Sequence, residues 1–146
     1  MPTERRALML TGLALVAGGA AAGTAGAPTH AAAAAPLFVN ATTDDPHRAR
    51  MAIVFAKNQQ ERGHPITIFR NDRGVLVASA KNADRFAMHH ELLATMLAAG
   101  AQVLVCPMCM EHFGVAAADL IPGAQVGNPD LTGAALFAPD TRTLTW

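Results

Sequence analysis

The chain has 146 residues, with 11 Lys and Arg against 11 Asp and Glu and a hydrophobic fraction of 51%. This length suits one domain, and the sequence shows no internal repeat. From Leu37 onward nine basic residues stand against ten acidic ones, without a basic stripe, which argues against nucleic acid as a partner.

Residues 1–35 read as an export signal followed by a small-residue linker. Arg5 and Arg6 precede an apolar run that ends near Ala22, and the next segment contains several Ala-x-Ala cleavage candidates. The run is shorter than the roughly 20 residues of a bilayer span and is broken by glycines, so we expect cleavage and no retained membrane span. The arginine pair fits a twin-arginine signal as well as a Sec signal. We therefore expect a periplasmic or otherwise exported protein with one domain over 36–146.

The rest of the chain alternates predicted strands with predicted helices. Apolar runs bounded by turn residues predict strands over 36–41, 65–70, 101–105, 124–126 and 142–146. Between them, periodic segments predict helices over 46–62, 84–99, 109–113 and 129–137, with a further helical turn within 114–123. Residues 75–78 fit either a brief strand or a turn. This alternation predicts an α/β fold with three layers, α/β/α, around a mostly parallel five-stranded sheet.

Capping residues mark the starts of the two long helices. Asp44 or Asp45 precedes Pro46 and is expected to cap the first helix, and Asp84 is expected to cap the second. Asp44 and Asp45 also follow the first strand, at the sheet edge where Cys106 lies, but capping is their expected role. On the first helix the apolar residues, Phe55 among them, are predicted to share one side.

The chain has two cysteines, and both lie in Cys106-Pro-Met-Cys109, directly after the predicted strand 101–105. In open α/β sheets reactive groups gather at the carboxyl ends of strands, where the amide groups of the next helix can stabilise a thiolate. Cys109 follows one helical turn later, within disulfide reach if the geometry permits. Met110 stands where haem attachment needs histidine, and no second Cys/His pair follows at zinc-finger spacing. A structural disulfide stays open as an alternative.

The segment Val105-Cys-Pro-Met-Cys-Met-Glu-His-Phe-Gly-Val115, followed by Ala118-Asp-Leu-Ile-Pro-Gly-Ala-Gln-Val126, resembles the DsrE/DsrF family of the sulfur-relay fold. The similarity extends in outline from Leu37 to Trp146. The resemblance implies a five-stranded α/β/α domain that forms homo-oligomers, as trimers or hexamers. It also implies that Cys106 occupies the position of a cysteine that can carry a transferable persulfide. The well-understood relay members are cytoplasmic, whereas this chain begins with a predicted export signal.

Three functions remain open at this point. The first is a sulfur carrier, in which the Cys106 thiolate takes a sulfane sulfur from a donor protein or small sulfur species and Cys109 resolves or tunes the persulfide. The second is a copper(I) module that binds through Cys106, Cys109, Met108 and His112, because thiolates, thioethers and imidazole suit that soft ion. The third is a thiol-disulfide oxidoreductase that uses both cysteines.

Other sulfur and imidazole side chains have ordinary expected roles. Met108 and Met110 are expected to pack in the core, and His112 is expected to be partly exposed. His89 and His90, next to Met88, point about 100° apart on a helix, so at most one of them is expected to face the cysteines. His47 and His64 flank the first helix and are expected to meet solvent.

Overall fold

The computed structural model describes residues 34–146. The predicted export signal, including Arg5 and Arg6, lies outside the described residues, as does nearly all of the linker. Within the part that is described, no helix is long and apolar enough to cross a bilayer.

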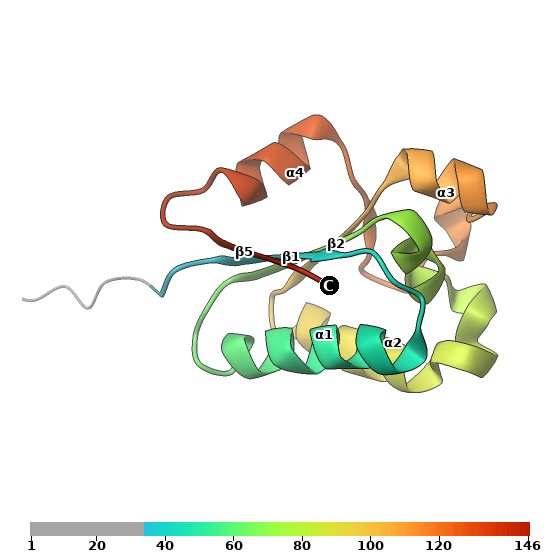
Figure 1. Ribbon diagram of the computed structural model, residues 1–146, viewed down its shortest axis with the longest axis horizontal. Coiled ribbons are helices and arrows are strands. Elements are labelled where there is room, and N and C mark those ends of the chain that lie inside the picture. The colour runs from blue at the N-terminus through green and yellow to red at the C-terminus, as the bar shows by residue number, and fades with distance from the viewer. Residues whose placement is uncertain (1–33) are drawn as a thin grey trace, which may run out of the picture. The chain divides into compact units, whose positions relative to one another are not determined.

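The centre of the fold is a five-stranded sheet in which every pairing is parallel (Figure 1). Its strands are β1 (Leu37–Ala41), β2 (Ile66–Arg70), β3 (Gln102–Val105), β4 (Gln125–Val126) and β5 (Arg142–Thr145). The order across the sheet is β4-β3-β2-β1-β5. The chain thus moves outward from β1 to β4 and then returns to the other side of β1. All five predicted strands are present, which confirms the α/β prediction.

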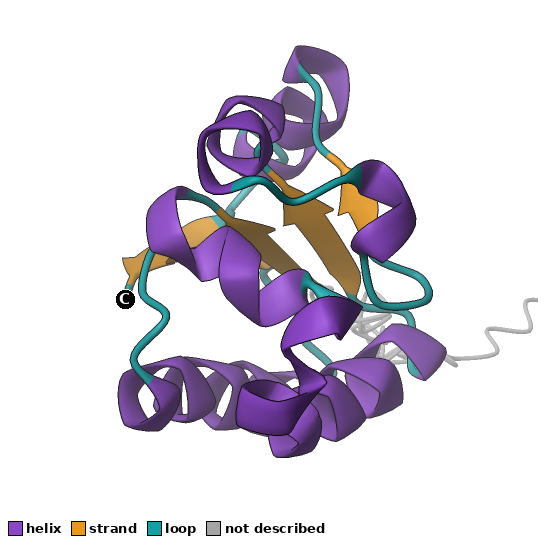
Figure 2. Ribbon diagram, turned by 90° about the vertical axis from the view of Figure 1, so that its right-hand side faces the viewer, coloured by secondary structure: helices purple, strands orange, loops and turns teal. Residues whose placement is uncertain are grey.

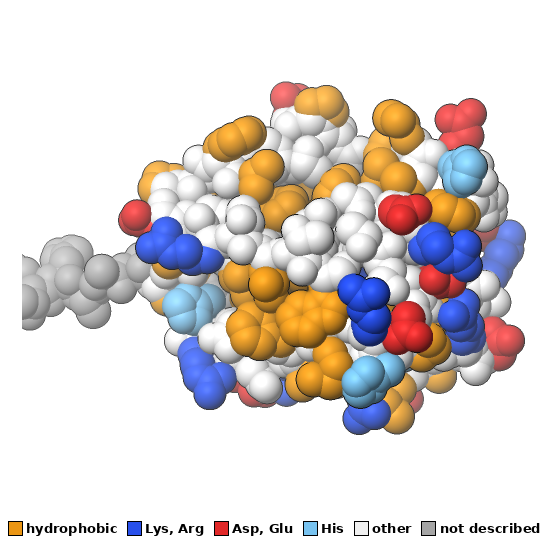
Figure 3. All heavy atoms as spheres, viewed as in Figure 1, with side chains coloured by type: hydrophobic (Ala, Val, Ile, Leu, Met, Phe, Trp, Pro, Cys, Tyr) orange, Lys and Arg blue, Asp and Glu red, His pale blue; other side chains and the backbone are white. Residues whose placement is uncertain are grey.

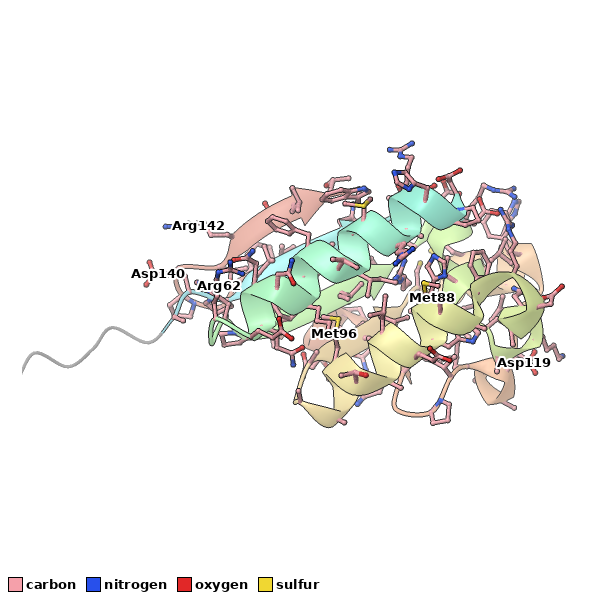
Figure 4. All side chains as sticks on the ribbon, turned by 90° about the horizontal axis from the view of Figure 1, so that it is seen from below. Arg62, Met88, Met96, Asp119, Asp140 and Arg142 are labelled. Atoms are coloured by element: carbon pink, nitrogen blue, oxygen red, sulfur yellow. The ribbon has the colours of Figure 1, made fainter. Side chains whose placement is uncertain are left out.

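Helices cover both faces of the sheet. The helices α1 (Pro46–Gln60) and α2 (Ala83–Ala98) lie side by side on one face (Figure 4). The helix α4 (Pro129–Leu136) lies over the opposite face, and α3 (Pro107–Phe113) lies beyond the carboxyl end of β3 (Figures 1 and 2). Short 3₁₀ segments, η1 (Asp72–Ala78), η2 (Ala80–Asn82) and η3 (Ala117–Asp119), complete the connections.

The main core lies between the sheet and the α1 and α2 pair. Alternate strand residues such as Ile68 and Val103 pack there against Ile53 of α1 and against Leu93 and Met96 of α2. Each of these five side chains is at most 1% exposed, and burial of one such side chain contributes about 1.5–3 kcal/mol. The opposite face has a thinner cover: α4, which lies over it, contains no buried residue.

Several local predictions are corrected by the structure. Residues 75–78 belong to the 3₁₀ segment η1, which lies close to β1: a Cβ on Gly74 would fall 2.1 Å from the backbone oxygen of Ala41. The first helix ends at Gln60 rather than 62, and only residues 117–119 of the predicted turn at 114–123 are helical. Asp84 lies inside the first turn of α2, whose N-cap is Asn82.

Phe55 also departs from its predicted place in the buried stripe. It is 40% exposed and lies 6.1 Å from Trp146, centroid to centroid. Together with the exposed Met51 these rings form an apolar patch between α1 and β5 (Figure 3). The reason is geometric: β5 is the edge strand, so the outer side of α1 has no further strand to cover it.

Candidate functional site

Cys106 lies at the carboxyl end of β3, as predicted. Its backbone N–H donates a 2.8 Å hydrogen bond to the carbonyl of Arg70, which extends the parallel ladder one residue past the strand. Its φ and ψ of −66° and 118° are extended, and Pro107 then begins α3, so that Cys106 is the N-cap residue. The side chain is half-buried. The first amides of α3 have no partners within the helix and are available to an anionic sulfur at this position.

Cys109 lies one helical turn later, and both cysteines are free thiols. The backbone N–H of Asp72 donates a hydrogen bond of 3.1 Å to Cys109 Sγ. Burial raises the pKa of the Cys109 thiol, and its hydrogen bond with the Cys106 side chain raises it further, while the Asp72 N–H acts in the opposite direction. Burial and Cys106 therefore both favour the neutral thiol of Cys109 over its thiolate.

The Asp72 amide was not anticipated, because the residues that follow the predicted strand 65–70, Asn71-Asp-Arg-Gly74, indicate only a turn. Asp72 has a φ of 44°, in the left-handed region that aspartate tolerates better than most residues. It lies two residues after the end of β2, the neighbour of β3, and Asn71 beside it donates a 2.7 Å side-chain hydrogen bond to Asn40 near the end of β1. The order of the strands could have predicted this contact, because the carboxyl ends of neighbouring parallel strands meet at one edge of the sheet (Figure 2).

Asp44 does not cap α1, which corrects half of the capping prediction. Asp45 is the cap, and its carboxylate accepts a 2.8 Å hydrogen bond from the Arg48 amide. Asp44 is buried and accepts hydrogen bonds from Arg73 at 2.8 and 2.9 Å and from Arg85 at 3.0 Å. These guanidinium groups, Arg73 foremost, hold the pKa of Asp44 below its usual value. The cluster ties together the β1–α1 loop, η1 and α2.

The predicted copper ligands do not form a ready ligand set. Met108 is 77% exposed, which contradicts its predicted place in the core, whereas Met110 is buried as predicted. His112 is exposed, and the edge of its ring packs against Phe113 at 4.6 Å. Across residues 34–146 no group of three or more His, Cys, Asp or Glu side chains could hold a metal ion. The copper(I) alternative would therefore depend on Cys106 and Cys109, because Met108 and His112 are both exposed.

The histidines of α2 are bound to backbone carbonyls. His89 Nε2 donates to the Pro46 carbonyl at 2.8 Å, and His90 Nε2 donates to the Val77 carbonyl at 3.0 Å. Burial is the main cause that lowers the pKa of His90. Met88 beside them is 50% exposed.

The two histidines at the ends of α1 differ. His47 is exposed, as predicted. His64 is half-buried, and its Nδ1 donates a 2.7 Å hydrogen bond to the carbonyl of Ala35, so it meets solvent less than predicted.

Arg70 was missed entirely, because the last residue of an apolar strand gives no sign of a buried charge. Its side chain is 0% exposed, and Nε, Nη1 and Nη2 find no hydrogen-bond partner among the described residues. Burial lowers the pKa of Arg70 to about 10. Because side chains alternate along a strand, Arg70 shares the α1 and α2 face with Ile68. Its backbone carbonyl nevertheless positions Cys106.

The profile of the DsrE/DsrF-like family matches residues 36–137, which include every strand but β5. The chain belongs to the DsrE/DsrF-like family. Membership confirms the resemblance drawn from the segment around Cys106 and suggests sulfur relay at the level of the family. No curated protein matches the sequence significantly.

Solved structures confirm the DsrE-like fold. The protein of unknown function MTH1491 from Methanobacterium thermoautotrophicum is 14% identical, with a TM-score of 0.64 over 77% of this chain and 99% of that chain. The protein of unknown function BT1422 from Bacteroides thetaiotaomicron is 23% identical, with a TM-score of 0.60 over 76% and 94%. The ychN protein from E. coli is 17% identical, with a TM-score of 0.56 over 77% and 99%. At these identities the similarity concerns the fold alone.

Proposed function

We propose that this DsrE-like protein is an exported carrier of sulfane sulfur, which it holds as a persulfide on Cys106. The observation that carries the proposal is the pairing of two free thiols at the carboxyl end of β3, the first of them at the N-cap of α3. Family membership supports the choice of sulfur as the cargo.

The loading step is a displacement at sulfur. With thiosulfate, the Cys106 thiolate attacks the outer sulfur, a new S–S bond forms, and the bond to the sulfonate sulfur breaks as sulfite leaves with the electron pair. The product is the Cys106 persulfide anion, and the total charge is unchanged. The free amides at the start of α3 are available to this anion.

Cys109 has a protective role in this proposal. Attack of Cys109 on the persulfide would release sulfide and leave a Cys106–Cys109 disulfide, but that attack requires a thiolate. Because burial and Cys106 raise the pKa of Cys109, the thiolate is scarce near neutral pH. The loaded protein then keeps its sulfur until an acceptor arrives, which is what a carrier needs.

Mass spectrometry of the intact purified protein tests the proposal directly. After incubation with polysulfide or thiosulfate, the wild type should gain about 32 Da per sulfur, and reduction should remove it. Cys106→Ser should abolish the gain, whereas Cys109→Ser should load and then lose no sulfur by disulfide formation. The absence of an adduct in the wild type, or its survival in Cys106→Ser, would refute the carrier. Insulin reduction by the wild type would instead favour the oxidoreductase.

A further inference from the structure

A groove lies between α4 and the sheet, on the face opposite the main core. Phe38 and Phe69 line it from β1 and β2, with ring centroids 6.2 Å apart, and Thr132 and Leu136 line it from α4. Its volume is about 390 Å³, which falls in the range of small-molecule sites. We call this cavity the α4 groove.

The α4 groove lies on the same face of the sheet as Cys106. Phe69 is the parallel partner of Leu104 in β3, so the two side chains share a face. Cys106 follows Leu104 by two residues, keeps an extended backbone and continues the ladder through its hydrogen bond to Arg70. By strand alternation its side chain therefore lies on the groove side of the sheet. The strand that leads to Cys106, β3, lies about 4.8 Å from β2, which carries Phe69.

Gly127 marks the junction between the groove and the cysteine loop. A Cβ at this position would lie 3.3 Å from the carbonyl oxygen of Val105, the residue before Cys106. The same Cβ would lie 3.4 Å from Phe69 Cε2 and 3.5 Å from Thr132 Cγ2, which are groove atoms. Gly127 thus lies between two residues of the groove lining and the backbone that leads into the reactive cysteine.

The lining of the α4 groove carries no ionisable side chain. The polar lining groups are the amide of Asn40 and the hydroxyls of Thr132, Thr143 and Thr145. Two arginines close to the cysteine loop are engaged elsewhere: Arg73 binds Asp44, and Arg70 is buried on the opposite face. An anionic body placed in this groove would lose its hydration without meeting a cation.

The position in the topology agrees with a ligand site. Asn40 and Thr145 are a register pair near the carboxyl ends of β1 and β5, the two strands between which the chain order reverses. In open α/β sheets, small ligands bind in the crevice at this reversal.

From these observations we propose that the α4 groove binds the organic body of a low-molecular-weight hydropersulfide, R–S–SH, whose R group is uncharged and largely apolar. The inference rests on the proposed function and names its donor class. The Cys106 thiolate attacks the outer sulfur of R–S–SH and forms a Cys106–S–SH persulfide. The S–S bond of the donor breaks, and R–S⁻ leaves with the electron pair, so that atoms and charge balance.

Two matched donors test the inference on the purified wild-type protein. Benzyl hydropersulfide and para-carboxybenzyl hydropersulfide, each generated in situ, differ only in one carboxylate, and thiosulfate serves as a donor without an organic body. The rate of Cys106 persulfidation is followed by mass spectrometry. The benzyl donor should react at least about tenfold faster than its carboxylate analogue, because the groove offers the carboxylate no partner. Equal rates would overturn the groove inference.

A variant pair places the specificity in the groove. Leu136→Lys adds a cation to the lining and should reduce the preference to about twofold or reverse it. Phe137→Lys adds the same charge at the next residue, which is 83% exposed and outside the lining. This variant should leave the preference for the benzyl donor unchanged. Neither site is buried, so both variants should fold.

The possible failures are distinguishable. If thiosulfate loads Cys106 while the two benzyl donors react equally, or if both lysine variants behave alike, the groove inference fails and the carrier stands. If no donor loads Cys106, the carrier and the groove inference fail together.

Discussion

Replacement of Arg70 by methionine should stabilise the protein. The guanidinium is completely buried, and no side chain or carbonyl within residues 34–146 accepts its hydrogen bonds. Burial lowers its pKa well below the usual value of arginine, to about 10. At 1.36 kcal/mol per pKa unit this corresponds to a penalty of about 3 kcal/mol for the charged form. Methionine keeps a flexible apolar chain of similar length and removes the charge.

We expect the free energy of unfolding of Arg70→Met to exceed that of the wild type by about 1–3 kcal/mol at pH 7. Because the native pKa lies below the unfolded one, the wild-type penalty is fully present below pH 10 and shrinks as the pH rises through that value. The gain should therefore be constant between about pH 5 and pH 9. The bond from the Cys106 amide uses the backbone of residue 70 and should survive.

Urea unfolding of the purified protein, followed by circular dichroism, measures the difference. Ile68→Met is the matched control, because Ile68 lies two residues earlier on the same buried face and its replacement should cost less than about 1.5 kcal/mol. The reasoning would be refuted if Arg70→Met lost more free energy of unfolding than Ile68→Met does. The guanidinium would then have a stabilising partner in solution.

Three further predictions concern the same end of the sheet. Asp44→Asn should lower the free energy of unfolding by about 1 kcal/mol at pH 7. Because the pKa of Asp44 is lowered in the folded protein, urea unfolding should show this difference from the wild type in full above pH 3.8. The difference should vanish as the pH falls through the pKa of Asp44 in the folded protein. Gly74→Ala should cost about 3 kcal/mol or more through its clash with Ala41, whereas Gly133→Ala, with open space around its Cβ, should gain up to about 1 kcal/mol in thermal unfolding. Alkylation of Cys109, mapped by peptide mass spectrometry, should reach half its maximal rate above pH 9.0, and Cys106→Ser should lower that midpoint; an unchanged midpoint would contradict the thiol pairing.

The strands and the place of Cys106 could be predicted because both depend on local signals. Runs such as Ile66–Arg70 carry the β-branched and aromatic pattern of a strand, and an apolar strand followed at once by Cys-Pro fixes the cysteine at its carboxyl end. Alternation of strands with helices then gives the parallel sheet. These features need no knowledge of what lies far away in the sequence.

The features that could not be predicted depend on contacts between distant segments. The carboxylates of Asp44 and Asp45 are equivalent as caps in sequence, and only the approach of Arg73 and Arg85, 29 and 41 residues later, separates them. The amide of Asp72 reaches Cys109 across 37 residues through a left-handed backbone that no residue pattern announces. Met108 and Met110 have the same chemistry, and the direction of a single helical turn decides which one is buried.

The absence of buried residues in α4 has a consequence for the diversity of this fold. The face that holds the molecule together, against α1 and α2, is separate from the face roofed by α4. Substitutions in α4 can therefore accumulate at little cost to folding. Relatives with the same scaffold are free to differ here, so under the proposed role of the α4 groove donor preference is expected to diverge among them faster than stability does.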